Sequence, residues 1–216
     1  MYRLCLVTDP GLVPREALVD TVLAAVRGGV TMVQLRDKTA SDDDLAAQAE
    51  MLLRALRPLG IPLLVDDRVE VAWVTGADGV HLGQDDASPA SARERLGRNA
   101  IIGLSITNAE QLAGAGASVA DYLGVGPYFA TPTKPGHDPP LGLDRARAIV
   151  ARARRPCLAI GGIDALRAPA VLATGVAGLA VVSAICGRPD PELAARELLP
   201  RAARPLAFPS KLEVLP

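Results

Sequence analysis

The chain has 216 residues, of which 50% are hydrophobic and 22% are charged, and its formal net charge is -1. This size and apolar content predict one well-buried globular domain or at most two small ones. The near-neutral charge gives no reason to expect nucleic acid or an anionic membrane as a partner, and apolar runs such as Ile101–Leu104 are far too short to span a bilayer.

Short apolar, β-branched runs recur along the chain and are predicted to be strands. They are continuous rather than alternating, which is typical of parallel strands that are buried on both faces. They lie near Leu4–Thr8, Met32–Arg36, Leu63–Asp66, Gly79–Leu82, Ile101–Ser105, Tyr122–Val125, Cys157–Ile160 and Leu179–Val182.

Longer stretches between these runs carry helix start and stop signals. Ser41 precedes three aspartates and is a predicted N-cap, Ser88-Pro89 begins another helix that ends at Gly97, and Asn108 is a predicted cap of the next. The expected helices are Pro14–Arg27, a segment from Ser41 to about Arg57, the segments that begin at Ser88 and Asn108, Leu143–Ala153, Ala165–Ala173 and Pro191–Leu199.

Eight strands that alternate with helices predict an α/β fold, a single (β/α)₈ TIM barrel over residues 1–199. The length is slightly below the typical value of about 250 residues. A doubly wound open sheet is the second choice, but no GxGxxG motif follows the first strand. Residues 200–216 contain four prolines and are expected to be a surface tail.

Polar residues follow nearly every predicted strand. In this fold the βα loops converge at the carboxyl ends of the strands, so such residues indicate an active site. They are Gln34-Leu35-Arg36-Asp37-Lys38, Asp66-Asp67-Arg68, His81-Leu82-Gly83-Gln84-Asp85-Asp86, Ser105, Gly126-Pro127 with Thr131-Pro132-Thr133-Lys134, Gly161-Gly162, and Val182-Ser183.

These residue types suit phosphate chemistry with a divalent metal. Gly162 lets a phosphate approach the backbone, and the N–H groups around Val182 and Ser183 are expected to open the next helix, where the dipole favours an anion. Asp67 and Asp86 are hard oxygen ligands of the kind that hold Mg²⁺ together with substrate phosphates. Arg36, Lys38 and Lys134 are expected to neutralise a second, more highly charged phosphate group.

The two histidines have different expected places. His81 lies within a predicted strand and is expected to be a hydrogen-bonded residue inside the barrel rather than a general base, whereas His137 lies in a Gly/Pro/Asp loop. A mechanism without an imidazole is therefore favoured. The three cysteines Cys5, Cys157 and Cys186 have no metal-like spacing, so we expect buried thiols in a cytoplasmic protein.

Taken in order from Leu4 to Ile185, the motifs above resemble those of the thiamine-phosphate synthase family. The resemblance implies a (β/α)₈ transferase that joins a hydroxymethylpyrimidine diphosphate to a thiazole phosphate, or to its carboxylated precursor, and releases pyrophosphate. It also implies Mg²⁺ as the cofactor and these two small molecules as the partners. A homo-oligomer is left open.

Position by position, the resemblance implies roles for the site residues. Gln34, Leu35, Arg36, Asp37, Lys38, Asp66, Ser105 and Lys134 would bind the pyrimidine diphosphate, with Gln34, Ser105 and Lys134 taking part in catalysis. Thr131, Pro132, Thr133, Gly162, Val182 and Ser183 would hold the thiazole phosphate, and Asp67 and Asp86 would bind Mg²⁺.

Two positions depart from the family pattern. The family usually has Asn immediately before the first metal-binding Asp, where this chain has Asp66. An extra carboxylate there would repel pyrophosphate unless it is protonated, turned away or engaged by the metal. The family also often has His two residues after the site serine, where this chain has Thr107.

Two other functions remain open. A related thiazole tautomerase would need a proton-transfer residue, for which a His is expected at position 107. A non-catalytic barrel that binds thiamine intermediates would explain the change at Asp66. The complete Gln34–Lys38 and Thr131–Lys134 segments favour the synthase over the tautomerase, and only Asp66 argues for the binding barrel.

Overall fold

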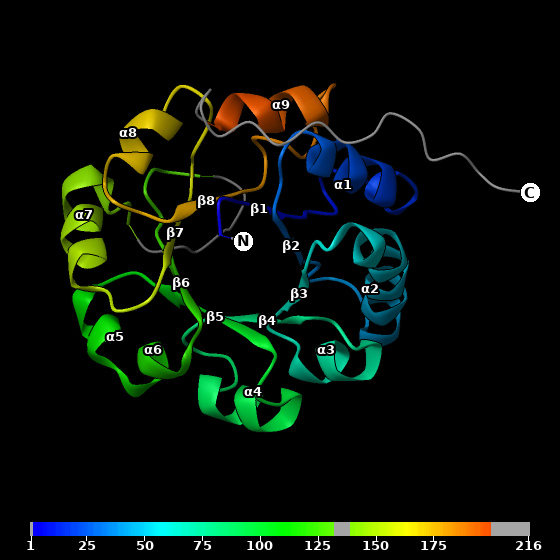
Figure 1. Ribbon diagram of the computed structural model, residues 1–216, viewed down its shortest axis with the longest axis horizontal. Coiled ribbons are helices and arrows are strands. Elements are labelled where there is room, and N and C mark those ends of the chain that lie inside the picture. The colour runs from blue at the N-terminus through cyan, green and yellow to red at the C-terminus, as the bar shows by residue number, and fades with distance from the viewer. Residues whose placement is uncertain (1, 132–138, 200–216) are drawn as a thin grey trace, which may run out of the picture.

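The computed structural model describes residues 2–131 and 139–199. Eight parallel strands pair each with the next, and β8 pairs with β1, so the sheet closes into a barrel with the helices outside it (Figure 1). The strands are β1 (Leu4–Val7), β2 (Met32–Leu35), β3 (Leu63–Asp66), β4 (Gly79–Leu82), β5 (Ile101–Ile106), β6 (Tyr122–Val125), β7 (Cys157–Ile160) and β8 (Gly178–Val181). The predicted (β/α)₈ barrel is confirmed.

The helices cover the outside of the barrel. They are α1 (Leu18–Arg27), α2 (Asp42–Leu56), α3 (Val69–Thr75), α4 (Pro89–Leu96), α5 (Ala109–Ala113), α6 (Ala115–Val119), α7 (Gly142–Arg152), α8 (Ala168–Leu172) and α9 (Pro191–Leu198). The 3-10 turns η1 (Arg15–Ala17) and η2 (Arg57–Leu59) precede α1 and follow α2. No helix among the described residues is long and apolar enough to cross a membrane.

Side-chain caps begin several of these helices at the predicted residues. Ser41 accepts a hydrogen bond from the Asp44 backbone, Ser88 from that of Ser91, and Asn108 from that of Gln111. Each such cap stabilises a helix by about 1 kcal/mol.

Four elements differ from the prediction. The helix expected from Pro14 begins only at Leu18, after the 3-10 turn η1. The segment after Asn108 forms two short helices, α5 and α6, because Gly114 has extended backbone between them. Helix α3 was not predicted, because it is rich in β-branched residues with modest helix propensity. It forms because Val71 and Ala72 are buried against the core. The helix expected from Ala165 begins only at Ala168.

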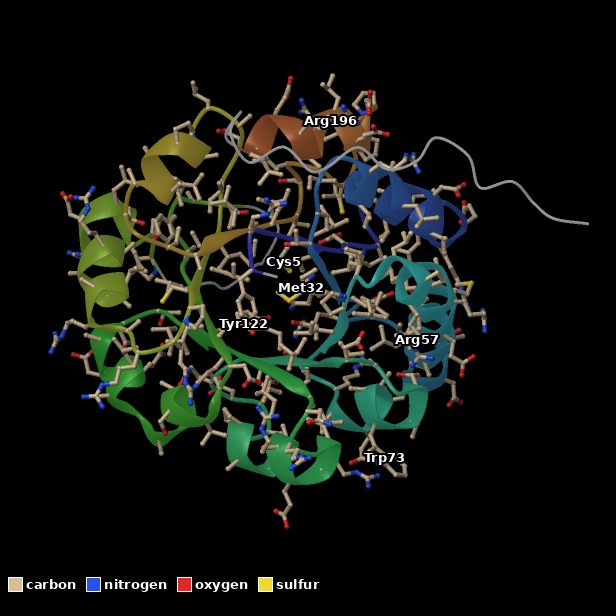
Figure 2. All side chains as sticks on the ribbon, viewed as in Figure 1. Cys5, Met32, Arg57, Trp73, Tyr122 and Arg196 are labelled. Atoms are coloured by element: carbon tan, nitrogen blue, oxygen red, sulfur yellow. The ribbon has the colours of Figure 1, made fainter. Side chains whose placement is uncertain are left out.

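Alternate residues of each strand face opposite sides of the barrel wall. One set packs against the helices and forms the larger core. The other set fills the barrel interior and includes Cys5, Met32, Leu64 and Tyr122. Figure 2 shows Cys5, Met32 and Tyr122 within the ring of strands, and Trp73 at the outer surface. The barrel is therefore a packed core, and its site lies at one end of it.

Candidate active site

The inward-facing positions continue to the carboxyl ends of the strands, where they become polar. Gln34 lies two residues after Met32, and Asp66 two residues after Leu64, so both face the barrel interior above the apolar cluster. Gln34 is 5% exposed. The period of two therefore places these side chains at the floor of the site.

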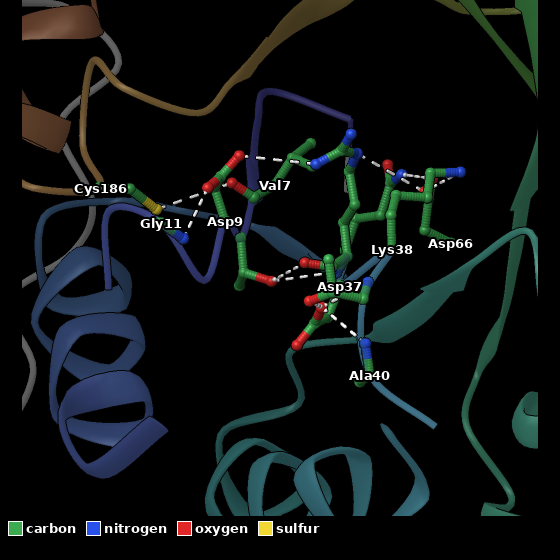
Figure 3. Close-up of polar contacts among 12 residues, drawn as sticks. Val7, Asp9, Gly11, Asp37, Lys38, Ala40, Asp66 and Cys186 are labelled. Atoms are coloured by element: carbon green, nitrogen blue, oxygen red, sulfur yellow. Dashed lines mark hydrogen bonds and ion pairs between the residues drawn. The ribbon is translucent and has the colours of Figure 1, made fainter. Parts of the chain in front are cut away.

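Asp66 is the centre of a cluster of polar side chains. Its Oδ1 accepts a hydrogen bond of 2.5 Å from Nε2 of Gln34. Its Oδ2 lies 3.0 Å from Nζ of Lys38 and 3.7 Å from Nε of Arg36. Figure 3 shows Asp66 beside Lys38. The Asp66 carboxylate is thus paired with two cations. The sequence had suggested that it is protonated, turned away or engaged by the metal, and this pairing is a fourth arrangement.

Arg36 is held at a second point by the loop after β1. Its Nη1 lies 3.5 Å from Oδ2 of Asp9, and the Thr8 hydroxyl accepts a hydrogen bond of 2.9 Å from the Arg36 backbone. The Arg36 side chain is only 16% exposed, so its charge is partly desolvated and directed toward the rim. Nothing in the sequence motifs indicated the pairing with Asp9.

Asp67 occupies a tight turn directly after β3. Its φ is 59°, and it is the one residue other than glycine with a left-handed backbone among the described residues. The turn is closed by a hydrogen bond of 2.7 Å from the Arg68 backbone to the Asp66 carbonyl. Aspartate tolerates this conformation better than most residues. The turn brings the Asp67 carboxylate into an ion pair with Lys38.

Asp86 lies in the loop after β4, next to the loop that carries Asp67. Its Oδ2 accepts a hydrogen bond of 2.7 Å from the Gly83 backbone, which leaves its second carboxylate oxygen for another partner. In the described residues no three His, Cys, Asp or Glu side chains gather as a ready metal cluster. Two carboxylates nevertheless fit Mg²⁺, which usually takes one or two from a protein and completes its shell with phosphate and water.

His81 and Ser105 form a hydrogen-bonded pair inside the barrel. Nε2 of His81 lies 3.0 Å from the Ser105 hydroxyl, and Nδ1 lies 2.8 Å from the Tyr122 hydroxyl. Two glycines leave room for the ring: a Cβ at Gly103 would lie 2.4 Å from Nδ1, and one at Gly124 would lie 3.0 Å from Cε1. The interior placement of His81 is confirmed, while its link to Ser105 was not anticipated.

A separate cavity of about 450 Å³ opens beyond β7 and β8. Thr131, Gly162 and Ser183 line it, so the structure brings together three residues predicted for the thiazole phosphate. Gly162 has φ of 64°, and a Cβ there would lie 2.7 Å from the Ala130 carbonyl oxygen. Glycine is therefore required by both the backbone conformation and the close packing of the two loops.

Arg167 connects these two loops and was not identified from the sequence. Its Nη1 donates a hydrogen bond of 2.8 Å to the Gly162 carbonyl, and its guanidinium lies 5.0 Å from the centre of the Phe129 ring. It also pairs with Asp164 at 3.4 Å. Arg167 lies within a segment that was expected to be an ordinary surface helix. Its position at the cavity is therefore seen only in the folded chain.

The expectation that Val182 and Ser183 open a helix is wrong. β8 is followed by a turn in which the Val182 carbonyl accepts from both Ile185 and Cys186. The turn ends at Gly187, whose φ is 73°, and Pro189 follows it, so the helical conformation cannot continue. Among the described residues nothing accepts a hydrogen bond from the Ser183 backbone N–H, which remains available at the cavity.

Two predicted residues direct their side chains elsewhere. Leu35 is 1% exposed and packs in the outer core between barrel and helices. Asp37 accepts hydrogen bonds from the Thr39 and Ala40 backbones. Partial burial alone would raise the pKa of Asp37, but hydrogen bonds from Thr39, Ala40 and Gln48 outweigh it and leave this pKa below its ordinary value. Pro132, Thr133, Lys134 and His137 lie outside the described residues.

Comparison with known proteins agrees with this geometry. A family model described as thiamine monophosphate synthase matches residues 4–185. A thiamine-phosphate synthase of Azorhizobium caulinodans is 48% identical over 195 residues, which are 90% of this chain and 92% of the relative. One of Xanthobacter autotrophicus is 50% identical over 195 residues, with 90% and 92% of the two chains covered.

Solved structures give the same result. A thiamine phosphate pyrophosphorylase from Pyrococcus furiosus has a TM-score of 0.81 and 38% identity, and the match covers 91% of this chain and 93% of that one. A 3-hexulose-6-phosphate synthase has a TM-score of 0.68 and 21% identity, with 94% and 100% covered, and shares the fold alone. Because the family model spans most of the chain and relatives are about half identical to it, the chain belongs to the thiamine monophosphate synthase family.

Proposed function

We propose that the protein is a thiamine-phosphate synthase. It joins 4-amino-2-methyl-5-hydroxymethylpyrimidine diphosphate to 4-methyl-5-(2-phosphoethyl)thiazole and forms thiamine phosphate and pyrophosphate; with the carboxylated precursor of the thiazole, CO2 is released as well. One observation carries the proposal beyond family membership: the barrel rim has two distinct parts. A cluster of charged side chains lies after β1 to β3, and a glycine-lined cavity lies after β7 and β8.

The charged part suits the pyrimidine diphosphate. Arg36 and Lys38 are cations that enter the rim from the loop after β2, and Lys134 is the third cation that the family resemblance assigns here. Arg36 and Lys38 are paired with Asp9, Asp66 and Asp67. Pyrophosphate, which carries more charge than one carboxylate, would replace these internal partners. Gln34 and Ser105 lie deeper and are suited to contact the pyrimidine ring.

Asp67 and Asp86 are the residues that would hold Mg²⁺. Bound there, the metal supplies neutralisation of the charge that develops on the departing diphosphate. Lys38, which pairs with Asp67, would then be available to the substrate. The chain's own contribution is to place carboxylates and cations on adjacent loops before the substrate arrives.

The cavity after β7 and β8 suits the phosphate of the thiazole substrate. Thr131 and Ser183 provide hydroxyl groups, and the backbones of Gly162 and Ser183 face the same space. Arg167 and Arg188 lie at its wall and add positive charge. Val182 contributes through its backbone, because its side chain packs against the barrel core.

The reaction needs no base from the protein. The C–O bond to the diphosphate breaks, the pyrimidine's own amino group stabilises the resulting cation, and the thiazole nitrogen forms the new C–N bond. His81 is enclosed by Tyr122 and Ser105, which agrees with a positioning role for its ring. Catalysis then rests on orientation of two substrates and on charge stabilisation.

The proposal is tested by incubating the purified protein with both substrates and Mg²⁺ and measuring thiamine phosphate and pyrophosphate. Equal amounts of the two products are expected, and excess EDTA should stop the reaction. Absence of product at micromolar enzyme would refute the synthase. No observation favours the tautomerase, because the Thr107 hydroxyl and N–H both bond to Gln111, and threonine is not a proton-transfer group near neutral pH.

Location and assembly follow as lesser proposals. The cysteines Cys5, Cys157 and Cys186 are all free and buried, which suits a cytoplasmic enzyme with small-molecule substrates. We expect neither nucleic acid nor membrane as a partner, and an assembly of identical chains is compatible with this function. Sedimentation of the purified protein would measure its oligomeric state.

A further inference from the structure

We propose that Asp66 is a positioning residue that fixes the side-chain amide of Gln34 with its oxygen toward the substrate. The pyrimidine subsite would thereby select a ring that carries a hydrogen-bond donor, such as an exocyclic amino group, over a ring with an oxo group at that position. This inference rests on the proposed function, since it concerns the same pyrimidine site.

The contact between the two side chains is short and protected. Nε2 of Gln34 donates to Oδ1 of Asp66 at 2.5 Å. Gln34 is 5% exposed, and the side chain of Asp66 is 10% exposed. Both project from the carboxyl ends of neighbouring parallel strands, β2 and β3, so the strand pairing fixes their separation.

The chemistry of a carboxylate decides which end of the amide it meets. A carboxylate is an acceptor only, and of the two ends of a glutamine amide only the nitrogen donates. The oxygen and nitrogen of an amide are often hard to distinguish by shape, but here the partner permits one orientation. An asparagine at position 66 has both a donor and an acceptor and would permit either. Asp66 therefore removes an ambiguity that the usual asparagine would leave.

The remaining oxygen of Gln34 is available to a ligand. No described residue donates a hydrogen bond to Oε1 of Gln34. Gln34 lies at the carboxyl end of β2 and keeps 5% of its surface exposed, so we place this oxygen toward the barrel mouth. An acceptor at that point attracts a donor on the ring and disfavours an oxo group, whose lone pairs would face it.

Asp66 also has an electrostatic effect, which the test must separate from amide orientation. Its Oδ2 pairs with Lys38 at 3.0 Å and with Arg36 at 3.7 Å. Loss of this charge would strengthen binding of any anion at the rim. Asp9 provides a control, because it pairs with Arg36 at 3.5 Å and, among the described contacts, does not bond to Gln34. Asp9→Asn removes one negative charge beside Arg36, one of the two cations that pair with Asp66, and leaves the amide alone.

The experiment compares wild-type protein with Asp66→Asn and Asp9→Asn. Calorimetry measures binding of the aminopyrimidine diphosphate, of the corresponding oxopyrimidine diphosphate and of inorganic pyrophosphate, and circular dichroism with thermal unfolding checks each fold. We expect both variants to bind pyrophosphate more tightly than wild type. Only Asp66→Asn should reduce the preference for the amino ring over the oxo ring, by about ten-fold, the scale of one misdirected hydrogen bond. In turnover this loss should appear mainly in KM.

Two results would overturn the proposal: an unchanged amino-over-oxo preference in Asp66→Asn, or an equal loss of preference in Asp9→Asn. If Asp66→Asn does not fold, wild type alone decides, since equal affinities for the two rings contradict the proposal. Failure of the proposed function is distinct, because wild-type protein would then form no thiamine phosphate from the two substrates whatever the ring preference of the variants.

Discussion

The imidazole of His81 joins the site to the barrel interior through Ser105, whose hydroxyl lies 3.0 Å from Nε2. The other ring nitrogen lies 2.8 Å from the Tyr122 hydroxyl, and Tyr122 is 1% exposed. Burial raises the pKa of Tyr122 well above its ordinary value, so its hydroxyl keeps a proton to donate. If Tyr122 donates to Nδ1, the Nε2–H of a neutral His81 donates to Ser105, and one buried hydroxyl sets the tautomer of the ring.

Tyr122→Phe tests whether the hydrogen bonds that link Tyr122 through His81 to Ser105 contribute to stability and turnover. The change removes the hydroxyl and leaves Nδ1 of His81 without this partner in the interior, which should lower the free energy of unfolding by about 1–3 kcal/mol. We also expect kcat to fall while KM for the thiazole phosphate stays the same, because we propose that Ser105 serves the pyrimidine half of the site. Urea unfolding and steady-state kinetics measure the two effects. Unchanged kcat in a folded variant would mean that the hydrogen bonds from Tyr122 through His81 to Ser105 have a structural role only.

The sequence was sufficient to predict the strands because each is a continuous apolar run. β3, β4, β6 and β7 have the predicted limits, and β8 (Gly178–Val181) begins and ends one residue before its prediction. The α3 helix was not foreseen since its β-branched residues carry little helix signal, and its stability comes from packing that only the closed barrel provides.

The site was predictable to the extent that it depends on residue type and strand ends. Gln34, Arg36, Lys38, Asp66 and Asp67 converge as expected. The sequence did not indicate which side chains from different loops contact one another. The contact of Arg167 with the Phe129 ring depends on how the loops after β6 and β7 pack together, and no local pattern encodes such a contact.

Arg167→Met should impair the thiazole half of the site. The guanidinium bonds to the Gly162 carbonyl at 2.8 Å, so its loss should free the loop that is proposed to bind the thiazole phosphate. We expect KM for the thiazole phosphate to rise about ten-fold and KM for the pyrimidine diphosphate to change little. Arg147→Met is the matched control, because Arg147 forms a similar pair with Asp144 at 3.2 Å on α7. Equal effects of the two changes would contradict a positioning role for Arg167.

The stability of the protein should decrease at alkaline pH because of its buried thiols. Burial raises the pKa of Cys5 from 9.0 to about 12. Above pH 9 the thiol ionises in the unfolded chain but stays protonated in the folded barrel. The unfolded state then binds fewer protons, so rising pH favours unfolding. One such thiol contributes a loss of about 1.4 kcal/mol per pH unit between pH 9 and about 12.

Cys5→Ala isolates this contribution. The variant should be less stable than wild type at pH 8, because the barrel interior loses a packed side chain. Its stability should nevertheless fall less steeply than that of wild type between pH 9 and pH 11, since Cys5 no longer titrates. Urea unfolding at several pH values gives both slopes. Parallel slopes would show that Cys5 is not protonated in the folded protein over this range.

Asp86 bonds to the loop after β4 and is also a proposed Mg²⁺ ligand. A conservative and a non-conservative substitution can separate these two roles. Oδ2 of Asp86 accepts a hydrogen bond of 2.7 Å from the Gly83 backbone, which closes the loop after β4, and the same carboxylate is a proposed Mg²⁺ ligand. In Asp86→Asn the amide oxygen can still accept from Gly83, but the negative charge is lost. In Asp86→Ala both the hydrogen bond and the charge are lost.

Both variants should therefore bind Mg²⁺ at least about ten-fold more weakly and lose turnover, whereas only Asp86→Ala should lose about 1 kcal/mol of unfolding free energy. Calorimetric Mg²⁺ binding in the presence of pyrophosphate measures the first effect, and urea unfolding without metal measures the second. If Asp86→Asn binds Mg²⁺ as wild type does, the carboxylate is not a metal ligand and serves the loop alone. If Asp86→Ala is as stable as wild type, the bond to Gly83 contributes nothing to the fold, and loss of activity in that variant would be assigned to the charge.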